Sequence, residues 1–336
     1  MRTSSLISSF QAAMAAVVLI GLLCATCNKN GTAAKPGTVS DSTNETKPAL
    51  RGRLVFHSYS CYDCNDSRLF LYDFSASTLT EISKGWTGLQ NCMNAQFSPD
   101  GSKLVFMGNP AGSVNWDVFI WNTRSASPPV NLTGHLGSAF RDEDPKFSFQ
   151  GNHIIFKQNG VLTLMDTLGT ILGKFPVPQS EASMPYFSRG DSLILYAGTD
   201  GSLSNIYLYH IRDSSVEFKS GLAGIYSYYP ITRDDTSFIF TSWYSGSNPH
   251  DQLYLGFFGN RAARYLPFNE PAGDYSDGCP AEKQFIFLSS TRKGSRGGYD
   301  LYVADMDSGN LWSLSDYYNG INSSNDELGC TYTPLP

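Results

Sequence analysis

The sequence predicts an all-β fold, a six-bladed β-propeller with four-stranded blades. The first observation behind this prediction is a pattern at 97–106 that returns in weaker form at 147–156, 187–196 and 231–240. Each copy is a strand, a tight turn rich in Gly or Asp, and a second apolar strand, so each predicts a β-hairpin. Hairpins that recur at intervals of about 40–50 residues indicate a repeat architecture.

A second recurring pattern follows each hairpin and predicts six blades. It is a short alternating strand that ends in a turn, and its copies stand at 67–73, 116–122, 160–166, 204–210, 251–257 and 299–305. A last short strand closes each unit, at 79–83, 130–133, 174–177, 216–219, 264–268 and 311–315. Six blades of this kind need about 280 residues, which 50–336 supply. Each sheet is expected to pack against its neighbours on both faces.

The first and last units are incomplete in a complementary way. The stretch 51–56 begins directly at the second strand of blade one, with no inner strand before it. The stretch 327–336 reads as a lone inner strand with no partner. We therefore expect the C-terminal strand, near 328–334, to complete blade one and close the ring. The alternative is a frayed terminus, because chain ends are often poorly ordered.

The repeat resembles that of a known family. The stretch 97–106, with the strand at 117–121 and the closing residues 131–133, is similar to the WD40-like, PD40-type repeat of the TolB-like β-propellers. The last blade, at 299–309, fits the same pattern, and the resemblance covers 50–336. It implies an exported envelope protein with protein partners. The resemblance is specific for the propeller and says less about activity, because one fold hosts many functions.

Residues 1–27 are predicted to be a lipoprotein signal peptide. A single charge, Arg2, precedes an apolar run that has the length of a signal peptide rather than of a spanning helix. The run ends in a sequence that resembles a bacterial lipobox, with Cys27 as the lipidated residue. Cleavage before Cys24 and ordinary secretory cleavage are the alternatives. We expect an exported protein, lipid-anchored in the bacterial envelope, in the outer membrane facing the periplasm or at the cell surface.

Residues 28–49 are predicted to be a flexible tether, since they are rich in Asn, Lys, Gly, Thr, Ser and Pro and show no apolar period. A lipid anchor followed by a tether suits a domain that is held near a membrane without packing on it. The net charge of −6 and the lack of a Lys/Arg cluster argue against a nucleic-acid partner. We expect a monomeric propeller.

Five cysteines remain outside the predicted signal peptide, and an exported compartment permits disulfides. In a four-stranded blade, the loops between the second and third strands and the loops between blades lie on one side, here called the loop face. All five cysteines are expected near one sector of that face: Cys61, Cys64, Cys92, Cys279 and Cys330.

Two disulfides are the leading interpretation of these cysteines. Cys279 and Cys330 each follow a Gly at the expected start of neighbouring inner strands, so a bridge between them would pin the closing strand. Cys61 and Cys64 could bridge each other, or one could reach Cys92. The alternative is a metal site formed by the CxxC pair, His57 and another Cys, but one CxxC without a second is a weak signal, so no metal site is predicted.

The loop face is also rich in aromatic residues, and interface hot spots are enriched in Trp and Tyr. Near the starts of inner strands stand Asp144, Asp277, Asp326 and Glu327, which are expected to make the mouth of the central channel acidic. The alternative for any single aromatic residue is that it caps a blade as part of the core. The candidate binding face comprises Trp86, Tyr226, Tyr228, Tyr229, Trp243, Tyr244, Tyr275, Tyr317 and Tyr318.

No catalytic motif is present in the sequence. It contains no G-x-S-x-G elbow, no H-E-x-x-H pattern and no P-loop, and its five histidines are scattered without acidic partners at fixed spacing. We therefore expect a non-catalytic binding module, without cofactor, that presents its loop face to a protein or to a cell-wall-associated partner. The alternatives are a polysaccharide-active lyase or glycosidase that uses channel carboxylates or a metal, and a structural scaffold in an outer-membrane complex.

Overall fold

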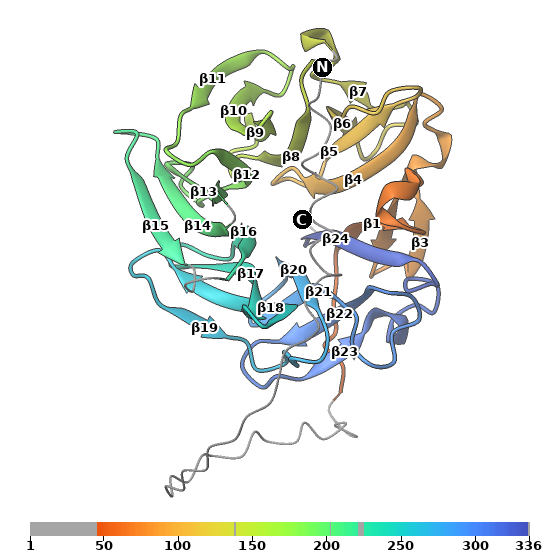
Figure 1. The fold of residues 1–336 in the computed structure, drawn as a ribbon. Helices are drawn as coiled ribbons and strands as arrows, with labels where there is room; N and C mark the ends of the chain where they lie inside the picture. The colour runs from red at the N-terminus through yellow and green to blue at the C-terminus, as the bar shows by residue number, and fades with distance from the viewer. Residues whose placement is uncertain (1–45, 138, 202, 221–224, 335–336) are drawn as a thin grey trace, which may run out of the picture. The chain divides into compact units, whose positions relative to one another are not determined.

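The computed structural model describes residues 46–137, 139–201, 203–220 and 225–334. The chain from Thr46 onward forms one compact unit. Within it, six antiparallel sheets of four strands each stand around a central channel, as the sequence predicts (Figure 1). The predicted signal peptide, including Cys27, and most of the predicted tether lie outside the described residues. In the part of the chain that the structure describes, no helix is long and apolar enough to cross a membrane.

The strands of each blade are given from the channel outwards. Blade one consists of β24 (Asp326–Thr333), β1 (Arg53–Tyr59), β2 (Arg68–Asp73) and β3 (Thr78–Glu81). Blade two consists of β4 (Leu89–Phe97), β5 (Lys103–Pro110), β6 (Asp117–Asn122) and β7 (Val130–Asn131). Blade three consists of β8 (Asp142–Phe147), β9 (His153–Gln158), β10 (Val161–Asp166) and β11 (Ile171–Phe175). Blade four consists of β12 (Glu181–Phe187), β13 (Leu193–Asp200), β14 (Leu203–His210) and β15 (Val216–Ser220). Blade five consists of β16 (Ser227–Thr232), β17 (Ser237–Ser245), β18 (Asn248–Phe257) and β19 (Ala263–Tyr265). Blade six consists of β20 (Tyr275–Pro280), β21 (Phe285–Ser290), β22 (Asp300–Asp305) and β23 (Leu311–Ser313). Four single-turn 3-10 helices lie in the described connections: η1 (Tyr62–Cys64), η2 (Ile82–Gly85), η3 (Gly134–Leu136) and η4 (Leu314–Asp316).

The predicted closure of the ring by the C-terminal strand is confirmed. β24 pairs antiparallel with β1, from Arg53 opposite Thr333 to Tyr59 opposite Asp326. The hydroxyl of Thr331 also donates to the carbonyl oxygen of Ala95 at 3.0 Å, which ties the closing strand to blade two. The two ends of the propeller sequence are therefore held together by a full strand pair.

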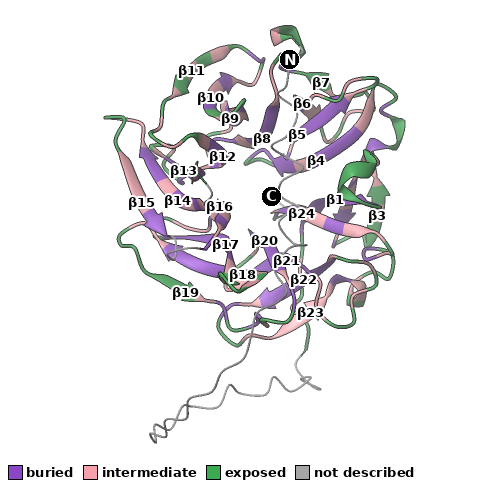
Figure 2. Cartoon of the chain, in the orientation of Figure 1, coloured by how far each residue is buried: buried purple, intermediate pink, exposed green. Residues whose placement is uncertain are grey.

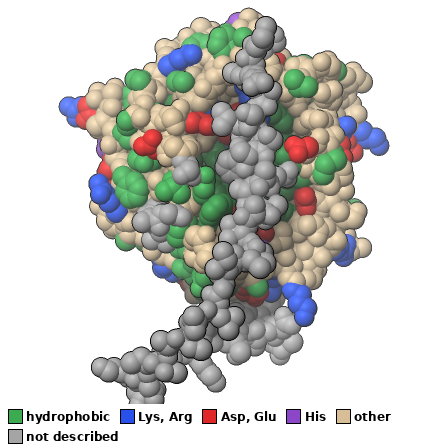
Figure 3. Space-filling model, viewed as in Figure 1, with side chains coloured by type: hydrophobic (Ala, Val, Ile, Leu, Met, Phe, Trp, Pro, Cys, Tyr) green, Lys and Arg blue, Asp and Glu red, His purple; other side chains and the backbone are tan. Residues whose placement is uncertain are grey.

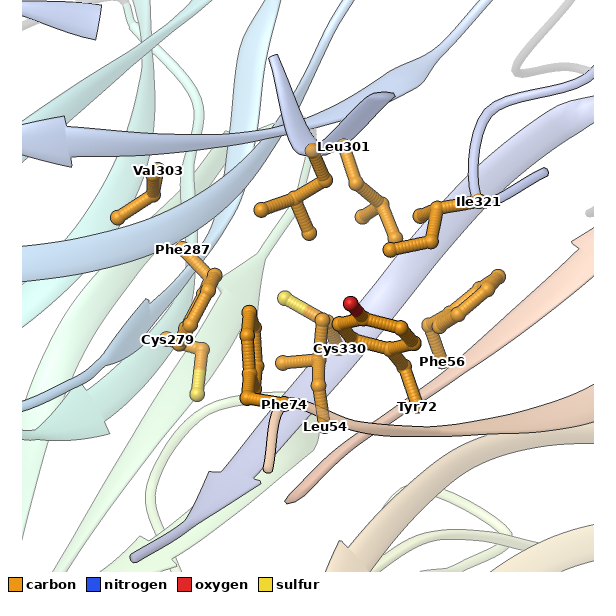
Figure 4. Close-up of a cluster of buried hydrophobic side chains, with 11 residues drawn as sticks. Leu54, Phe56, Tyr72, Phe74, Cys279, Phe287, Leu301, Val303, Ile321 and Cys330 are labelled. Atoms are coloured by element: carbon orange, nitrogen blue, oxygen red, sulfur yellow. The ribbon is translucent and has the colours of Figure 1, made fainter. Parts of the chain in front are cut away.

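The core lies between the blades, where apolar faces of neighbouring sheets meet. The inner and middle strands are mostly buried, whereas the outer strands and loops carry most of the exposed residues (Figure 2). The cluster between blades six and one joins Phe56, Tyr72, Phe74 and Phe287 across the closing strand (Figure 4). The second strand of every blade contributes one buried aromatic residue: Phe56, Phe106, Phe156, Tyr196, Phe240 and Phe287.

Every inner strand contains a β-bulge, which the sequence analysis did not anticipate. The strand register shifts at the same place in all six blades. One residue at each shift has a positive φ, a conformation that Asn, Asp and Gly adopt most easily. Bulges redirect side chains, and these six face the central channel. They are Asn94, Asp144, Met184, Tyr229, Asp277 and Gly329.

Two boundaries differ from the expectation. The fourth strand of blade three is β11 and begins earlier than the predicted 174–177. The inner strand of blade six begins at Tyr275, so Cys279 stands near its end and not at its start.

Candidate functional site

The six bulge residues line a cavity in the central channel. Its empty volume is about 460 Å³, including the part that is open to solvent, and Lys146, Ile231 and Cys330 also face it. Because each inner strand contributes one bulge residue, five side chains and Gly329 meet at one level of the channel. We call this set of residues the bulge ring.

Two carboxylates of the bulge ring and the ammonium group of the neighbouring Lys146 give the cavity its charge. The amide of Asn94 donates to Asp144 Oδ1 at 2.8 Å, and the backbone N–H of Gly329 donates to Asp277 Oδ2 at 3.2 Å. Burial raises the pKa of Asp277 to about 6, although the hydrogen bond from Gly329 and the charge of Lys146 act in the opposite direction. Burial lowers the pKa of Lys146, while the carboxylates of Asp144 and Asp277 act in the opposite direction. Asp144 and Asp277, predicted as channel-mouth acids, are thus brought together.

Tyrosine hydroxyls surround the bulge ring. Burial, followed by the nearby carboxylates of Asp326 and Asp277, raises the pKa of Tyr59. Burial and the carboxylates of Asp251, Asp274 and Asp277 likewise raise the pKa of Tyr299. On the face that Figure 3 shows, Asp and Glu side chains gather towards the middle of the ring among hydrophobic side chains, whereas Lys and Arg lie mostly near the rim.

A second acidic group stands beside this mouth in blade five. The hydroxyl of Tyr228 donates to Asp251 Oδ1. Burial raises the pKa of Asp251 to about 7, and the carboxylates of Asp274 and Asp277 contribute to the increase. The Nδ1 atom of His250 lies 3.1 Å from Asp274 Oδ1. Asp251, like Asp277, therefore ionises less readily than an exposed carboxyl group.

His57 is a structural residue of the channel wall. Burial lowers its pKa to about 3, so the imidazole is neutral at physiological pH. Its ring stacks on Tyr59 with centroids 5.7 Å apart, and its Nδ1 accepts a hydrogen bond from the backbone N–H of Asn94 at 3.5 Å. A side chain on Gly329 would overlap this ring, so the close approach of β24 requires glycine there.

Part of the predicted aromatic face is assembled on blade five. The rings of Tyr226 and Trp243 are 4.6 Å apart, and Tyr244 packs against Tyr265 with centroids 6.2 Å apart. Tyr244 is 43 % exposed. With Tyr228 and Tyr229 in the channel mouth, five of the nine predicted residues lie on one side of the propeller.

The other four predicted aromatic residues do not belong to this surface. Trp86 stacks on Phe106 within the core, and Tyr275 is fully buried between blades five and six. Tyr317 and Tyr318 lie on the flank between blades six and one, where Tyr318 packs against Tyr72 at 5.7 Å. They follow η4 in the connection from β23 to β24.

Tyr317 instead holds the segment that enters the propeller. Its hydroxyl donates to the carbonyl oxygen of Pro48 at 2.8 Å, and the Lys47 ammonium lies 4.5 Å from its ring centroid. Lys47 also donates to the carbonyl oxygen of Asp316. Residues 46–49, which were expected to belong to the tether, are therefore attached to the propeller.

The remaining predicted acids have different surroundings. Glu327 is buried and accepts hydrogen bonds from Ser58 at 2.9 Å and from the Ser323 hydroxyl at 2.6 Å, so it fastens the closing strand. Asp326 accepts a hydrogen bond from the backbone N–H of Tyr299 at 2.8 Å and stays near the channel mouth. Asp326 therefore adds to the acidic channel mouth, whereas Glu327 does not.

The cysteines follow the prediction in part. Cys61 and Cys64 form a disulfide around η1, in the loop between β1 and β2. The predicted bridge between Cys279 and Cys330 is not formed, since both are buried free thiols, and both belong to the core of Figure 4. A hydrogen bond with the Cys279 thiol, together with burial, raises the pKa of Cys330. Cys92 is also a free thiol and lies in β4, not in a loop.

Sequence reasoning missed Lys146, Tyr59 and Tyr299 as residues of the channel and its mouth. A usable signal was present, because Asn or Asp stands three residues before the end of β4, β8 and β20, where the bulges lie. Among the described residues, no group of three or more His, Cys, Asp or Glu side chains could hold a metal ion.

Comparisons with known proteins identify the fold. No protein-family model matches the chain, and no curated protein matches it. Among solved structures, TolB from Acinetobacter baumannii is similar with a TM-score of 0.65 and 14% identity over 84% of this chain and 67% of that one. Hydrazine synthase from Kuenenia stuttgartiensis has a TM-score of 0.65 and 13% identity over 85% of this chain, which spans 47% of the synthase chain. A protein described as TolB from Agrobacterium tumefaciens has a TM-score of 0.57 and 14% identity over 85% of this chain and 100% of that one. The chain is thus a TolB-like six-bladed β-propeller in fold.

Proposed function

We propose that this chain is a non-catalytic binding module of the bacterial envelope. A signal peptide at 1–27 exports it, a lipid on Cys27 anchors it, and the tether that follows carries the propeller. The loop face then holds a protein or cell-wall-associated partner. The observation that carries the proposal is the combination, on one side of the ring, of the aromatic group Tyr226, Trp243 and Tyr244 with the acidic, tyrosine-lined channel mouth.

The end of the propeller at which β1 begins supports a loop face that points away from the anchor. β1 begins at Arg53, whose guanidinium donates to the carbonyl oxygen of Gly101 at 2.7 Å in the turn between β4 and β5. That turn lies at the end of the propeller opposite Tyr59 and the loop face. The chain therefore enters from the side that leaves the loop face accessible, which suits a module tethered behind its binding surface.

The test is capture of partners from detergent-solubilised membranes with the immobilised propeller. A Trp243→Ala, Tyr244→Ala variant is expected to lose the captured partner, because aromatic anchors dominate interface energies. The matched control is Leu168→Ala, which removes an 85 % exposed apolar side chain from the turn between β10 and β11, on the opposite face. Equal capture by the wild type and the double variant would refute the assignment of this surface.

A polysaccharide-active enzyme is the second candidate, favoured by one observation. Asp277, with a pKa raised to about 6 by burial, shares a cavity with Asp144, and pairs of carboxyl groups in different surroundings serve as acid and base in glycan cleavage. Incubation with cell-wall and capsular polysaccharides, followed by assay of reducing ends and of unsaturated products, tests it. Product formation that is lost in Asp277→Asn would favour the enzyme over the binding module.

A further inference from the structure

We infer that the bulge-ring cavity binds a single primary alkylammonium group, presented as a lysine side chain on a peptide segment of a partner. The inference rests on the proposed function only for the source of this group. The site itself is argued from the residues that line the cavity.

The first argument is charge. Asp144 and Asp277 are only 8% and 7% exposed, and together with Lys146 they leave the cavity with one uncompensated negative charge when all three are ionised. A desolvated charge without a partner is costly, and pairing it with an opposite charge relieves that cost. One incoming monovalent cation would neutralise the cavity.

The second argument is unused hydrogen-bonding capacity. Asp144 Oδ1 and Asp277 Oδ2 are held by Asn94 and by the backbone N–H of Gly329. Within the ranges that the structure describes, the other oxygen of each carboxylate has no hydrogen-bond donor, and Lys146 forms no ion pair. One oxygen of each carboxylate is therefore available to a group that enters the cavity, and an ammonium group brings three donors.

The third argument is the shape and chemistry of the remaining wall. Tyr229, Met184 and Ile231 supply an aromatic ring, a thioether and an aliphatic side chain. An aromatic face attracts organic cations, and the apolar groups suit the methylene stem of a lysine. Calcium and magnesium ions take about six oxygen ligands, whereas this wall offers two carboxylates, so an organic cation fits it better.

The surroundings of the mouth favour a cation approaching along the channel. Tyr59 and Tyr299 stand beside the carboxylates of Asp326 and Asp251. A negatively charged funnel of this kind concentrates cations and repels anionic segments. A lysine-bearing segment would thus be drawn towards the bulge ring.

The test is calorimetric titration at pH 8 and low salt with acetyl-Gly-Lys-Gly-amide. The same peptide with Nε-acetyl-lysine serves as the neutral control. The charged peptide is expected to bind at least tenfold more tightly than the acetylated one. Asp277→Asn and Asp144→Asn should each weaken binding at least tenfold. Lys146→Met should strengthen it, because removing the internal cation leaves two unbalanced carboxylates.

Matched controls separate the site from general effects. Asp200→Asn, in an exposed position at the end of β13, should leave the affinity unchanged. Thermal unfolding of each variant shows whether the propeller is intact, and the opposite signs expected for Lys146→Met and Asp277→Asn cannot both come from loss of folding. Equal binding of the charged and acetylated peptides, or weaker binding by Lys146→Met, overturns the inference.

Three further outcomes complete the test. Binding of spermidine without binding of the lysine peptide overturns the peptide source. Membrane capture that persists in Asp144→Asn and Asp277→Asn, with no lysine-peptide binding, overturns the cation site while the proposed function stands. Lysine-peptide binding without any captured partner supports the site and counts against the proposed function.

Discussion

Replacing Asp277 by Asn is expected to stabilise the propeller in a pH-dependent way. Burial raises the pKa of the Asp277 carboxyl from an ordinary value of 3.8 to about 6. The protonated form therefore suits the folded state better than the ionised form does. The resulting stability is fully present below pH 3.8 and is lost as the pH rises through 6. An amide cannot ionise, so the variant avoids this loss.

The size of the effect follows from the same pKa values. Because one pKa unit corresponds to about 1.4 kcal/mol, ionising Asp277 lowers the free energy of unfolding by about 3 kcal/mol above pH 7. Asn suits the position, since it tolerates the φ of 54° and can accept the hydrogen bond from the Gly329 N–H. Asn94 already occupies the equivalent bulge in blade two. The loss of one carboxylate near Lys146 offsets part of the gain.

Urea unfolding at pH 4, 6 and 8 measures the prediction. Wild type and Asp277→Asn should be nearly equal in stability at pH 4. At pH 8 the variant should be more stable by up to about 3 kcal/mol, or about 5 °C in Tm for a domain of this length. Asp200→Asn, on the exposed end of β13, is the control and should show no such trend. A variant that is less stable at pH 8, or equally stabilised at pH 4 and pH 8, would refute the reasoning.

Four other predictions concern the anchor, the ring closure and one loop. Cys27→Ala should move the protein from the membrane to the soluble fraction, and unchanged partitioning would rule out this anchor. Truncation after Leu328 removes most of β24 and exposes strand edges in blade one, so we expect aggregation or a strongly lowered Tm, and a wild-type Tm would contradict the closure. Gly329→Ala should destabilise the fold by about 2 kcal/mol or more, because φ is +57° and no space exists for a methyl group; chemical unfolding measures it. In mass spectrometry of the unfolded, non-reduced protein, Cys61 and Cys64 should resist alkylation while the other described cysteines react.

The sequence by itself determined the architecture. The recurring hairpins and the six alternating strands predict the blades because strand periodicity and turn composition are local properties of the chain. The buried aromatic residue of each second strand, from Phe56 to Phe287, belongs to the same repeated pattern. The incomplete blade one predicted the pairing of β24 with β1, since blade one lacks an inner strand and the C-terminal end supplies a lone one.

Only the tertiary structure decided the site. Asp144 and Asp277 were expected at the mouth of the channel, but their meeting with Lys146 in one cavity depends on the convergence of inner strands from different blades on one axis. The bulges that turn these side chains inward depend on strand register, which composition alone does not specify. Tyr317 packs against Phe74 of blade one, a contact between neighbouring blades that the sequence pattern does not specify. Propeller strands are thus predictable from periodicity, whereas the chemistry of the channel arises from convergence around the ring.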